Sequence, residues 1–247
     1  MQGGAGSGIT APPSCFLRGG AGVGGRGGEY GFSSATLGKS VLAEMPNGSY
    51  VLSKDGFAQF TNKSAANRYS EDSGKTIKLS TAQREALEDY QVSSAVMNTR
   101  LRNSDSMSDA YTIRDLDAAM NKTSLADNIV LFRGVSGDSM RALGIKQANA
   151  NALKGLVGKS IRDRAYLSTS TDQSVMAKFS KDADGSQGVG IIIKAAKGSR
   201  ALPVSAGKTA YGNRESEFIL PRRASLKVTG ITERNGTPIL IVEYRSR

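Results

Sequence analysis

The chain contains no histidine, no tryptophan and a single cysteine among its 247 residues. Without histidine, a Ser-His-Asp triad, a Cys-His pair and a histidine-bound zinc ion are all excluded. Cys15 alone can form neither an internal disulfide nor a cysteine-based metal site, which suits a reducing compartment. Any catalysis therefore depends on carboxylates, hydroxyls, lysine, arginine, tyrosine or backbone groups.

Long apolar runs and a conventional export signal are also missing. No stretch approaches the roughly 20 apolar residues needed to cross a bilayer. The first 20 residues lack a basic region followed by an apolar one. If the protein leaves its cell, we expect a route without a signal peptide, or release from a longer chain.

Positive charge, in contrast, is abundant, with a net charge of +11. Such an excess suits nucleic acid, an anionic membrane surface, an acidic protein or a phosphate-rich ligand as partner. A solvated basic surface explains it equally well. The content of 38% hydrophobic residues is that of a lean globular protein.

Glycine divides the chain into regions. Residues 1–40 hold 13 of the 29 glycines, and such a stretch cannot recover its ordering entropy by burial, so we predict a flexible leader there. Residues 41–79 are expected to form a small N-terminal segment, with turn signals at Asn47-Gly48 and Asp55-Gly56 that favour a hairpin. Residues 80–247 are predicted to form the main domain.

The main domain shows helical patterns first and strand patterns afterwards. Ser80 is a suitable N-cap for a helix whose inner face recurs at helical spacing. That face consists of Leu87, Tyr90, Ser94, Met97 and Leu101. Further helices are expected over residues 112–120, 139–156 and 173–179. Strands are expected over 129–135, 165–171, 188–196, 200–206, 216–224, 225–233 and 237–245, with a hairpin turn at 234–236. This order predicts an α+β fold, in which N-terminal helices precede a β-sandwich of two packed sheets.

Two strand ends carry polar residues that suggest chemistry. Residues 131–134 read LFRG, which places Arg133 near the end of an apolar strand. Its planar guanidinium can bind phosphate through two parallel hydrogen bonds. Residues 166–171 read YLSTST, and four consecutive hydroxyls at a strand end could hold a carboxylate and a ribose in place. Each pattern also has an ordinary reading, a surface arginine in an ion pair and a hydroxyl-rich edge strand.

A third pattern places two carboxylates where a loop enters a strand. Residues 214–221 read RESEFILP, and in an extended chain Glu215 and Glu217 would point the same way. Carboxylates on one face repel each other unless cations lie nearby. In the sequence, the nearby cations are Arg214, Arg222 and Arg223.

In this order, the three patterns resemble the signature of the arginine-specific mono-ADP-ribosyltransferases of bacterial toxins, effectors and phages. That signature is an arginine, then Ser-Thr-Ser, then Glu-x-Glu, each on its own strand. The upstream helix is similar too, with Tyr90 early and Asn98-x-x-Leu101-Arg102 late. The resemblance covers about residues 81–247.

The resemblance implies NAD as co-substrate, bound in a cleft of the fold, and no metal. Arg133 would grip the NAD phosphates, and Gly134 would leave its backbone open to the nicotinamide amide. Phe179 would flank the nicotinamide, although a phenylalanine there would equally suit the core. Lys178 or Lys181 could add a phosphate contact, and the sequence does not choose between them.

Two catalytic roles follow from the same resemblance. Ser168 would orient Glu217, while Thr169 and Ser170 would shape the floor of the site. Glu217 would bind the ribose 2′-hydroxyl and oppose the positive charge that develops on the ribose as nicotinamide leaves.

The acceptor is expected to be an arginine of a target protein. The resemblance implies that Glu215 orients the acceptor guanidinium, because relatives with glutamine at this position modify other side chains. Tyr211, near the tip of the loop at 205–214, is expected to recognise the substrate. We expect secretion or injection and action in the target-cell cytoplasm. A susceptible producer would need an immunity protein.

Two alternatives stay open. An NAD glycohydrolase would use water in place of arginine, and would share Arg133, Ser168 and Glu217 without needing Glu215. A basic binding protein with an inactive transferase fold would suit the charge and the leader. No nucleic-acid motif is recognisable, however, and the leader has few aromatic residues to stack on bases. Nucleic acid is therefore not the expected partner.

Overall fold

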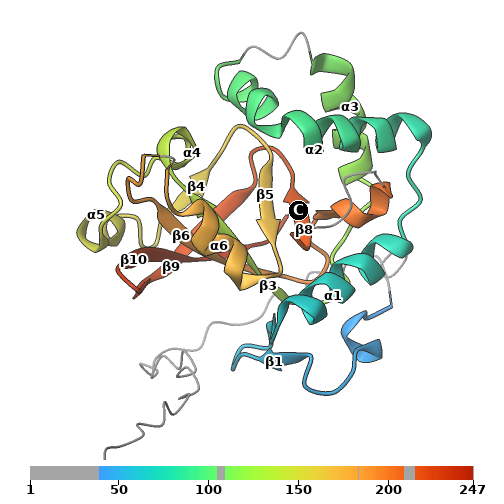
Figure 1. Cartoon of the computed structure of the whole chain (residues 1–247), viewed down its shortest axis with the longest axis horizontal. Helices are drawn as coiled ribbons and strands as arrows, with labels where there is room; N and C mark the ends of the chain where they lie inside the picture. Colours follow the sequence, from blue (N-terminus) through green and yellow to red (C-terminus); the bar gives the residue numbers. More distant parts are fainter. Residues whose placement is uncertain (1–38, 105–108, 183, 209–214, 247) are drawn as a thin grey trace, which may run out of the picture. The chain divides into compact units, whose positions relative to one another are not determined.

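This computed structural model describes residues 39–104, 109–182, 184–208 and 215–246. They form strands and the helices that cover them (Figure 1). The predicted leader lies almost wholly outside these residues, and the predicted domain boundaries stay predictions. Within the described ranges, no helix is both long and apolar enough to cross a membrane.

The N-terminal segment forms the predicted hairpin. A short 3₁₀ turn, η1 (Leu42–Glu44), precedes the antiparallel strands β1 (Tyr50–Leu52) and β2 (Ala58–Phe60). Gly56, in the connection between them, adopts a left-handed φ of 79° that glycine tolerates without steric cost. β2 also pairs with the strand β3 (Ile129–Val135) through Ala58 and Ile129, so the hairpin extends the main sheet.

Helix α1 (Lys63–Lys75) follows the hairpin and was not predicted. Asn62 caps it by accepting a hydrogen bond from the backbone N–H of Ala65 (2.9 Å). Its buried face consists mainly of small residues and one tyrosine, Tyr69, so the apolar pattern that normally indicates a helix is weak. The residues of this face are small because the segment around Ser205 packs closely against the helix. A Cβ on Gly74 would lie 2.3 Å from Ser205 Oγ.

Helices α2 (Thr81–Arg102) and α3 (Ala110–Met120) confirm two predictions and pack side by side (Figure 1). Ser80 and Gln83 form a capping box at the start of α2, which satisfies two backbone donors at once. On the predicted inner face, Leu87, Tyr90 and Met97 are buried.

The region after β3 is only partly as predicted. Instead of one helix over 139–156, two short helices form, α4 (Gly137–Ala142) and α5 (Ala150–Lys154). The chain leaves α4 at Gly144, whose φ is 76°, a left-handed conformation that commonly ends a helix. Strand β4 (Ser160–Arg162) was not expected, whereas helix α6 (Gln173–Phe179) is confirmed at its predicted bounds.

The remaining strands are β5 (Leu167–Ser170), β6 (Val189–Ala195), β7 (Leu202–Pro203), β8 (Glu217–Leu220), β9 (Ser225–Arg234) and β10 (Thr237–Tyr244). β7 is shorter than expected because a 3₁₀ turn, η3 (Val204–Gly207), follows it. The strand order is β4-β9-β10-β6-β3-β5-β8-β7, with β2 beside β3. The α+β class is confirmed. The two-sheet detail is not fully confirmed, because the described strands form one hydrogen-bonded network.

One joint in this network positions the site. β3 pairs with β6 along its whole length but with β5 only through Phe132 and Ser170. The strands β5, β8 and β7 therefore diverge from the rest at that point. The end of β3 and the whole of β5 meet there, and they carry Arg133 and the hydroxyl run.

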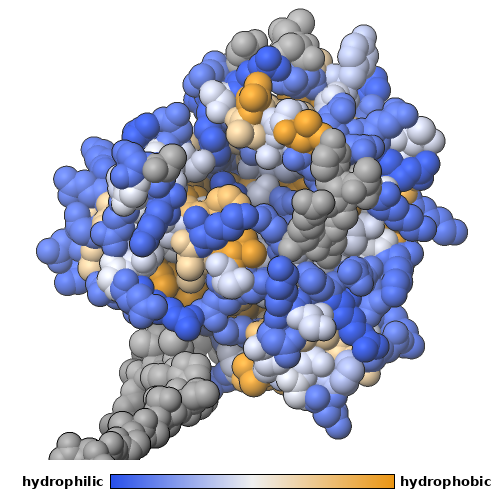
Figure 2. All heavy atoms as spheres, in the orientation of Figure 1, coloured by the Kyte–Doolittle hydropathy of each residue, from blue (hydrophilic) through white to orange (hydrophobic). Residues whose placement is uncertain are grey.

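The sides of β3 face two different apolar clusters. Ile129, Leu131 and Val135 belong to the largest cluster, whereas Val130 and Phe132 belong to a smaller one. By strand alternation, the next residue on the side of Leu131 is Arg133. The surface in Figure 2 is mostly hydrophilic, with small apolar patches over α2 and around α6.

Candidate active site

Arg133 occupies a row of β3 that otherwise holds core residues. Its Nη1 donates a hydrogen bond to the backbone carbonyl of Ser168. Its buried Nε has no hydrogen-bond partner among the described residues, and burial lowers the pKa of the guanidinium. The Arg133 side chain is half-buried, and a buried donor such as its Nε is costly to leave without a partner. The arrangement therefore fits an anionic ligand such as the diphosphate of a dinucleotide.

Gly134 is required by packing. A Cβ at this position would lie 2.4 Å from the carbonyl oxygen of Met176 and 2.4 Å from the backbone carbon of Phe179. The last turn of α6 thus rests directly on the end of β3. That Gly134 also leaves its backbone open to nicotinamide stays a prediction.

All four hydroxyls of residues 168–171 bond the segment 215–218. The contacts are Ser168 with the Glu217 carboxylate, Thr169 with the Phe218 carbonyl (2.7 Å), Ser170 with the Glu215 carbonyl and Thr171 with the Ser216 carbonyl (3.2 Å). This explains the run: its side chains fasten the two glutamates to the end of β5. Because the hydroxyls of Thr169 and Ser170 are used within the protein, their share in the floor of an NAD site stays a prediction.

The two glutamates flank a turn rather than lying in one extended strand. Ser216 has a φ of 48°, and β8 begins only at Glu217. The extended geometry in which both side chains would point the same way is therefore not the one adopted. The carboxylates nevertheless remain near each other, since the charge of Glu215 helps to raise the pKa of Glu217.

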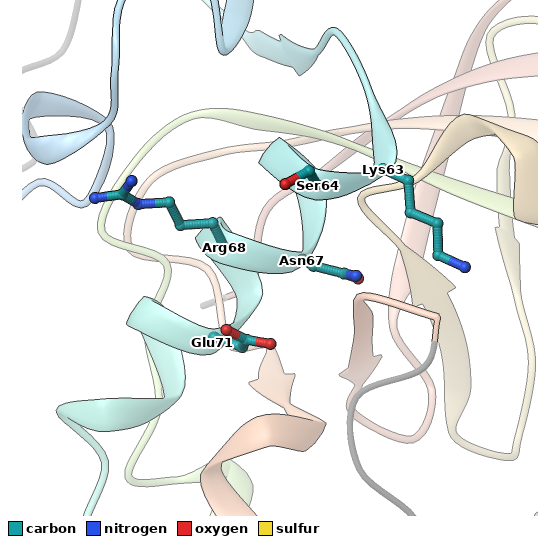
Figure 3. Close-up of a pocket in the computed structure, with 5 residues that line it drawn as sticks. All are labelled: Lys63, Ser64, Asn67, Arg68 and Glu71. Carbon is teal, nitrogen blue, oxygen red and sulfur yellow. The ribbon is translucent and has the colours of Figure 1, made fainter.

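Helix α1 supports this turn from the other side. The Ser216 hydroxyl bonds Asn67 Oδ1, and the Ala66 carbonyl accepts a hydrogen bond from Thr171 Oγ1 (3.1 Å). In Figure 3, Asn67 and Lys63 point to the same side of α1, whereas Arg68 points to the other. These three residues, with Ser64 and Glu71, line a shallow pocket that contains none of the predicted site residues. Sequence reasoning missed Asn67 because it missed α1.

Glu217 is a carboxyl group whose pKa is raised well above its ordinary value by its surroundings. Burial raises its pKa from 4.5 to about 7, and the charge of Glu215 adds to this. The hydrogen bond from Ser168 and the charge of Arg133 lower it, but do not cancel the effect of burial. A carboxyl group that titrates near neutral pH inside a protein often marks a functional site.

A chain of hydrogen bonds leads to Glu217 from α2. The backbone N–H of Tyr166 donates to Asn98 Oδ1 (3.2 Å), which turns Asn98 Nδ2 toward Tyr90 Oη (3.1 Å). Tyr90 Oη lies 3.0 Å from Ser168 Oγ. Since Tyr90 accepts from Asn98, its own proton points to Ser168, and the Ser168 proton is left for Glu217. Burial raises the pKa of Tyr90, which keeps the tyrosine protonated and the chain intact.

Glu215 bonds a cation that the sequence did not suggest for it. Lys178 Nζ donates to Glu215 Oε1 (2.7 Å), and the same ammonium lies 4.7 Å from the centre of the Phe179 ring. Arg222, one of the three cations near the glutamates in sequence, instead bonds Asp117. Phe179 is 43% exposed, which rules out the alternative that it is a core residue.

Two candidate residues lie beyond the described ranges. Tyr211 and Arg214 fall in residues 209–214, outside the described residues. The predicted role of Tyr211 in substrate recognition therefore stays a prediction. Across the part of the chain that the structure describes, no three His, Cys, Asp or Glu side chains gather as a metal site would require.

Comparison with known proteins gives the family of the chain. The family model described as ADP-ribosyltransferase exoenzyme matches residues 66–245. No curated protein sequence matches the chain significantly. Among solved structures, the chain is similar to C3stau2 from S. aureus, solved with NAD, with a TM-score of 0.62 and 19% identity over 77% of this chain and 99% of that one.

Two further solved structures share the fold. The C3 exoenzyme of Clostridium limosum has a TM-score of 0.60 and 20% identity, covering 78% of this chain and 98% of that one. ADP-ribosyltransferase Vis in complex with agmatine has a TM-score of 0.54 and 18% identity, covering 75% of this chain and 86% of that one.

The family match runs from α1 to β10 and includes Arg133, the hydroxyl run and both glutamates. The co-substrate of this family is NAD, as the sequence predicted, and the positive charge of the half-buried Arg133 suits its phosphates. The fold, the site and the family match agree, and the chain belongs to the ADP-ribosyltransferase exoenzyme family.

Proposed function

We propose that the chain transfers ADP-ribose from NAD to an arginine side chain of a target protein and releases nicotinamide. The observation that carries the choice of acceptor is the environment of Glu215. This carboxylate lies beside the catalytic candidate Glu217, its side chain is 37% exposed, and it already bonds a cationic side chain. An arginine that enters the site would meet the same carboxylate.

The NAD side of the reaction depends on Arg133 and Glu217. The half-buried side chain of Arg133 offers its guanidinium charge to the NAD phosphates. Glu217 accepts the ribose 2′-hydroxyl and places negative charge where positive charge develops on the ribose. This contact is stronger in the transition state than in the bound substrate, which is the condition for catalysis.

The hydrogen-bond chain through Ser168 fixes the Glu217 carboxylate for this task. Ser168 donates to Glu217 and is itself fixed by Tyr90. Such groups need no reorganisation when the charge develops. With a pKa of about 7, Glu217 is about half ionised at neutral pH, and the active carboxylate form increases above that pH.

The acceptor side depends on Glu215. A guanidinium has a pKa above about 12 and is a poor nucleophile while protonated. A carboxylate can hold it by two parallel hydrogen bonds and accept a proton as the new bond forms. The structure of Vis in complex with agmatine, a small guanidinium compound, supports this choice of acceptor for a related fold.

The biological setting proposed is that of a secreted or injected toxin or effector, or of a phage enzyme. The target would be a protein that presents an accessible arginine, and a susceptible producer would carry an immunity protein. In support, Exoenzyme S from Pseudomonas aeruginosa, which shares the fold with a TM-score of 0.52, was solved in complex with human 14-3-3 protein beta.

The test uses labelled NAD and agmatine with the wild type, Glu215→Gln and Glu217→Gln. We expect label transfer by the wild type, loss of transfer but retained NAD hydrolysis in Glu215→Gln, and loss of both in Glu217→Gln. Glu243→Gln, an exposed change on β10, is the control and should behave as the wild type. Hydrolysis without transfer by the wild type would favour the NAD glycohydrolase, and no NAD turnover would leave only the basic binding protein.

A further inference from the structure

The ion pair between Lys178 and Glu215 joins α6 to the turn that carries the two glutamates. Nζ of Lys178 lies 2.7 Å from Oε1 of Glu215, and the lysine side chain is 65% exposed. The two residues are 37 positions apart in sequence. Their contact is therefore created by the fold and not by a local turn.

The lysine occupies the position that the acceptor needs. Glu215 is the carboxylate proposed to bind the acceptor guanidinium, and one of its oxygens is already bonded to the Lys178 ammonium. We infer that Lys178 fills the acceptor subsite of the resting enzyme, and that the guanidinium of the incoming arginine must displace it. This inference rests on the proposed function of Glu215.

The chemistry of the two cations favours displacement. An ammonium is a point charge that donates here to one carboxylate oxygen, whereas a guanidinium donates to both oxygens in a planar fork. The pair is also exposed to water, where ion pairs are weak. An arginine can therefore replace Lys178 at little cost, and the lysine lowers the apparent affinity for the acceptor only a few-fold.

The ring of Phe179 gives the ammonium a second contact. Lys178 Nζ lies 4.7 Å from the ring centre, within the range of a cation–π interaction. When no acceptor is bound, the lysine compensates the charge of Glu215 close to Glu217. Without the lysine, the charges of the two neighbouring carboxylates would repel each other.

Two substitutions of Lys178 should change acceptor binding in opposite directions. At saturating NAD, Lys178→Met removes the competitor and should lower the KM for agmatine about 2- to 5-fold. Lys178→Arg provides a planar fork that competes better, so it should raise this KM above the wild-type value. A purely structural role for Lys178 would not produce opposite changes. Lys159→Met, which removes one exposed charge before the edge strand β4, is the matched control and should leave both KM values unchanged.

The KM for NAD separates this inference from its rivals. If Lys178 instead contacts the NAD phosphates, Lys178→Met raises the KM for NAD and leaves that for agmatine unchanged, which overturns the inference. A rise in the agmatine KM with both substitutions would show that Lys178 helps to bind the acceptor, with the same consequence. NAD hydrolysis without transfer to agmatine in every variant would refute the arginine acceptor itself, and this inference with it.

Discussion

The two glutamates lie two residues apart, yet the protein holds them by opposite means. Glu217 is bonded by Ser168, behind which Tyr90 and Asn98 form a neutral, largely buried chain of hydrogen bonds. Glu215 is bonded by Lys178, a side chain that is 65% exposed. We call these the inner and the outer carboxylate.

The difference matches what each carboxylate has to do. A hydrogen-bond chain away from water is strong and fixes geometry, as the inner carboxylate needs if it is to meet the same ribose atom in every turnover. An ion pair in water is weak and exchanges readily, as the outer carboxylate needs if it is to release one cation and take up another. The partner of Glu217 thus holds that carboxylate in place, whereas the partner of Glu215 leaves that carboxylate able to exchange one cation for another.

Removing the inner charge should have the largest effect. Glu217→Gln keeps the size of the side chain but loses the negative charge opposite the ribose, so both NAD hydrolysis and transfer to agmatine should fall by about 10²–10³ in kcat. Single-turnover measurements with labelled NAD would check this. Hydrolysis that continues at the wild-type rate would contradict the role of Glu217.

The same substitution should stabilise the fold at high pH. The pKa of Glu217 is about 7 in the folded protein against 4.5 ordinarily, so the folded state holds this proton more tightly than the unfolded chain. The wild type therefore loses stability as the pH rises from about 4.5 through 7, by at most about 3 kcal/mol. Glu217→Gln should melt higher than the wild type at pH 8 and close to it at pH 4.5.

Breaking the hydrogen-bond chain at Tyr90, one residue beyond Ser168 from Glu217, should lower kcat less than removing the charge of Glu217. Tyr90→Phe removes the hydroxyl that fixes Ser168 and leaves Asn98 Nδ2 without its acceptor. Misplacement of Glu217 should lower kcat for NAD hydrolysis on the order of 10-fold. The unpaired amide should cost about 1–3 kcal/mol of stability.

Tyr244→Phe is the matched control for this experiment. Tyr244, on β10, is also buried, and its hydroxyl donates to the carbonyl of Arg200 (2.8 Å), in the connection between β6 and β7. Neither segment carries a candidate site residue. This variant should lose a similar amount of stability in a melting experiment while keeping kcat. If both tyrosine variants kept full activity, the hydrogen-bond chain would have only a structural role.

The sequence alone predicted most of the elements and residues of this comparison, but not the cation that bonds Glu215. β3, β6 and α6 were predicted at or within a residue of their bounds, because apolar runs and caps decide such elements locally. Arg133, Ser168 and both glutamates were selected from their motifs, and the structure brings them to one joint of the sheet. The partner of Glu215 could not be read, because a contact across 37 residues depends on the fold.

Helix α1 and the turn at Ser216 were also not predicted from the sequence, for related reasons. Helix α1 packs by small residues and carries little apolar signal, so neither the helix nor Asn67 was expected. In the hydroxyl run at 168–171, Ser168 was expected to bond Glu217, but the bonds of the other three hydroxyls to the backbone carbonyls of 215–218 were not expected. A serine with a φ of 48° is uncommon, and nothing in the local sequence announces it.

The coupling between the two carboxylates predicts a moderate effect of pH. Because the proposed active form of Glu217 is the carboxylate, kcat/KM for NAD hydrolysis should rise with pH through about 7. The charge of Glu215 helps to raise this pKa, so Glu215→Gln should move the rising limb to lower pH. A pH profile measured without an acceptor would check both points. A shift to higher pH would mean that Glu215 does not act on Glu217 through its charge.

The smallest effect is also the one that separates the two carboxylates most directly. Salt shortens the range of electrostatic interactions in water from about 30 Å at 0.01 M to about 3 Å at 1 M. The exposed Lys178 pair should therefore lose its influence, and the ratio of agmatine KM values between wild type and Lys178→Met should approach one at 1 M NaCl. The inner chain consists of neutral groups shielded from water, so the loss of kcat in Tyr90→Phe should be the same at both salt concentrations. If salt abolished the Tyr90→Phe effect, or left the Lys178→Met ratio unchanged, the distinction between a fixed inner and an exchangeable outer carboxylate would fail.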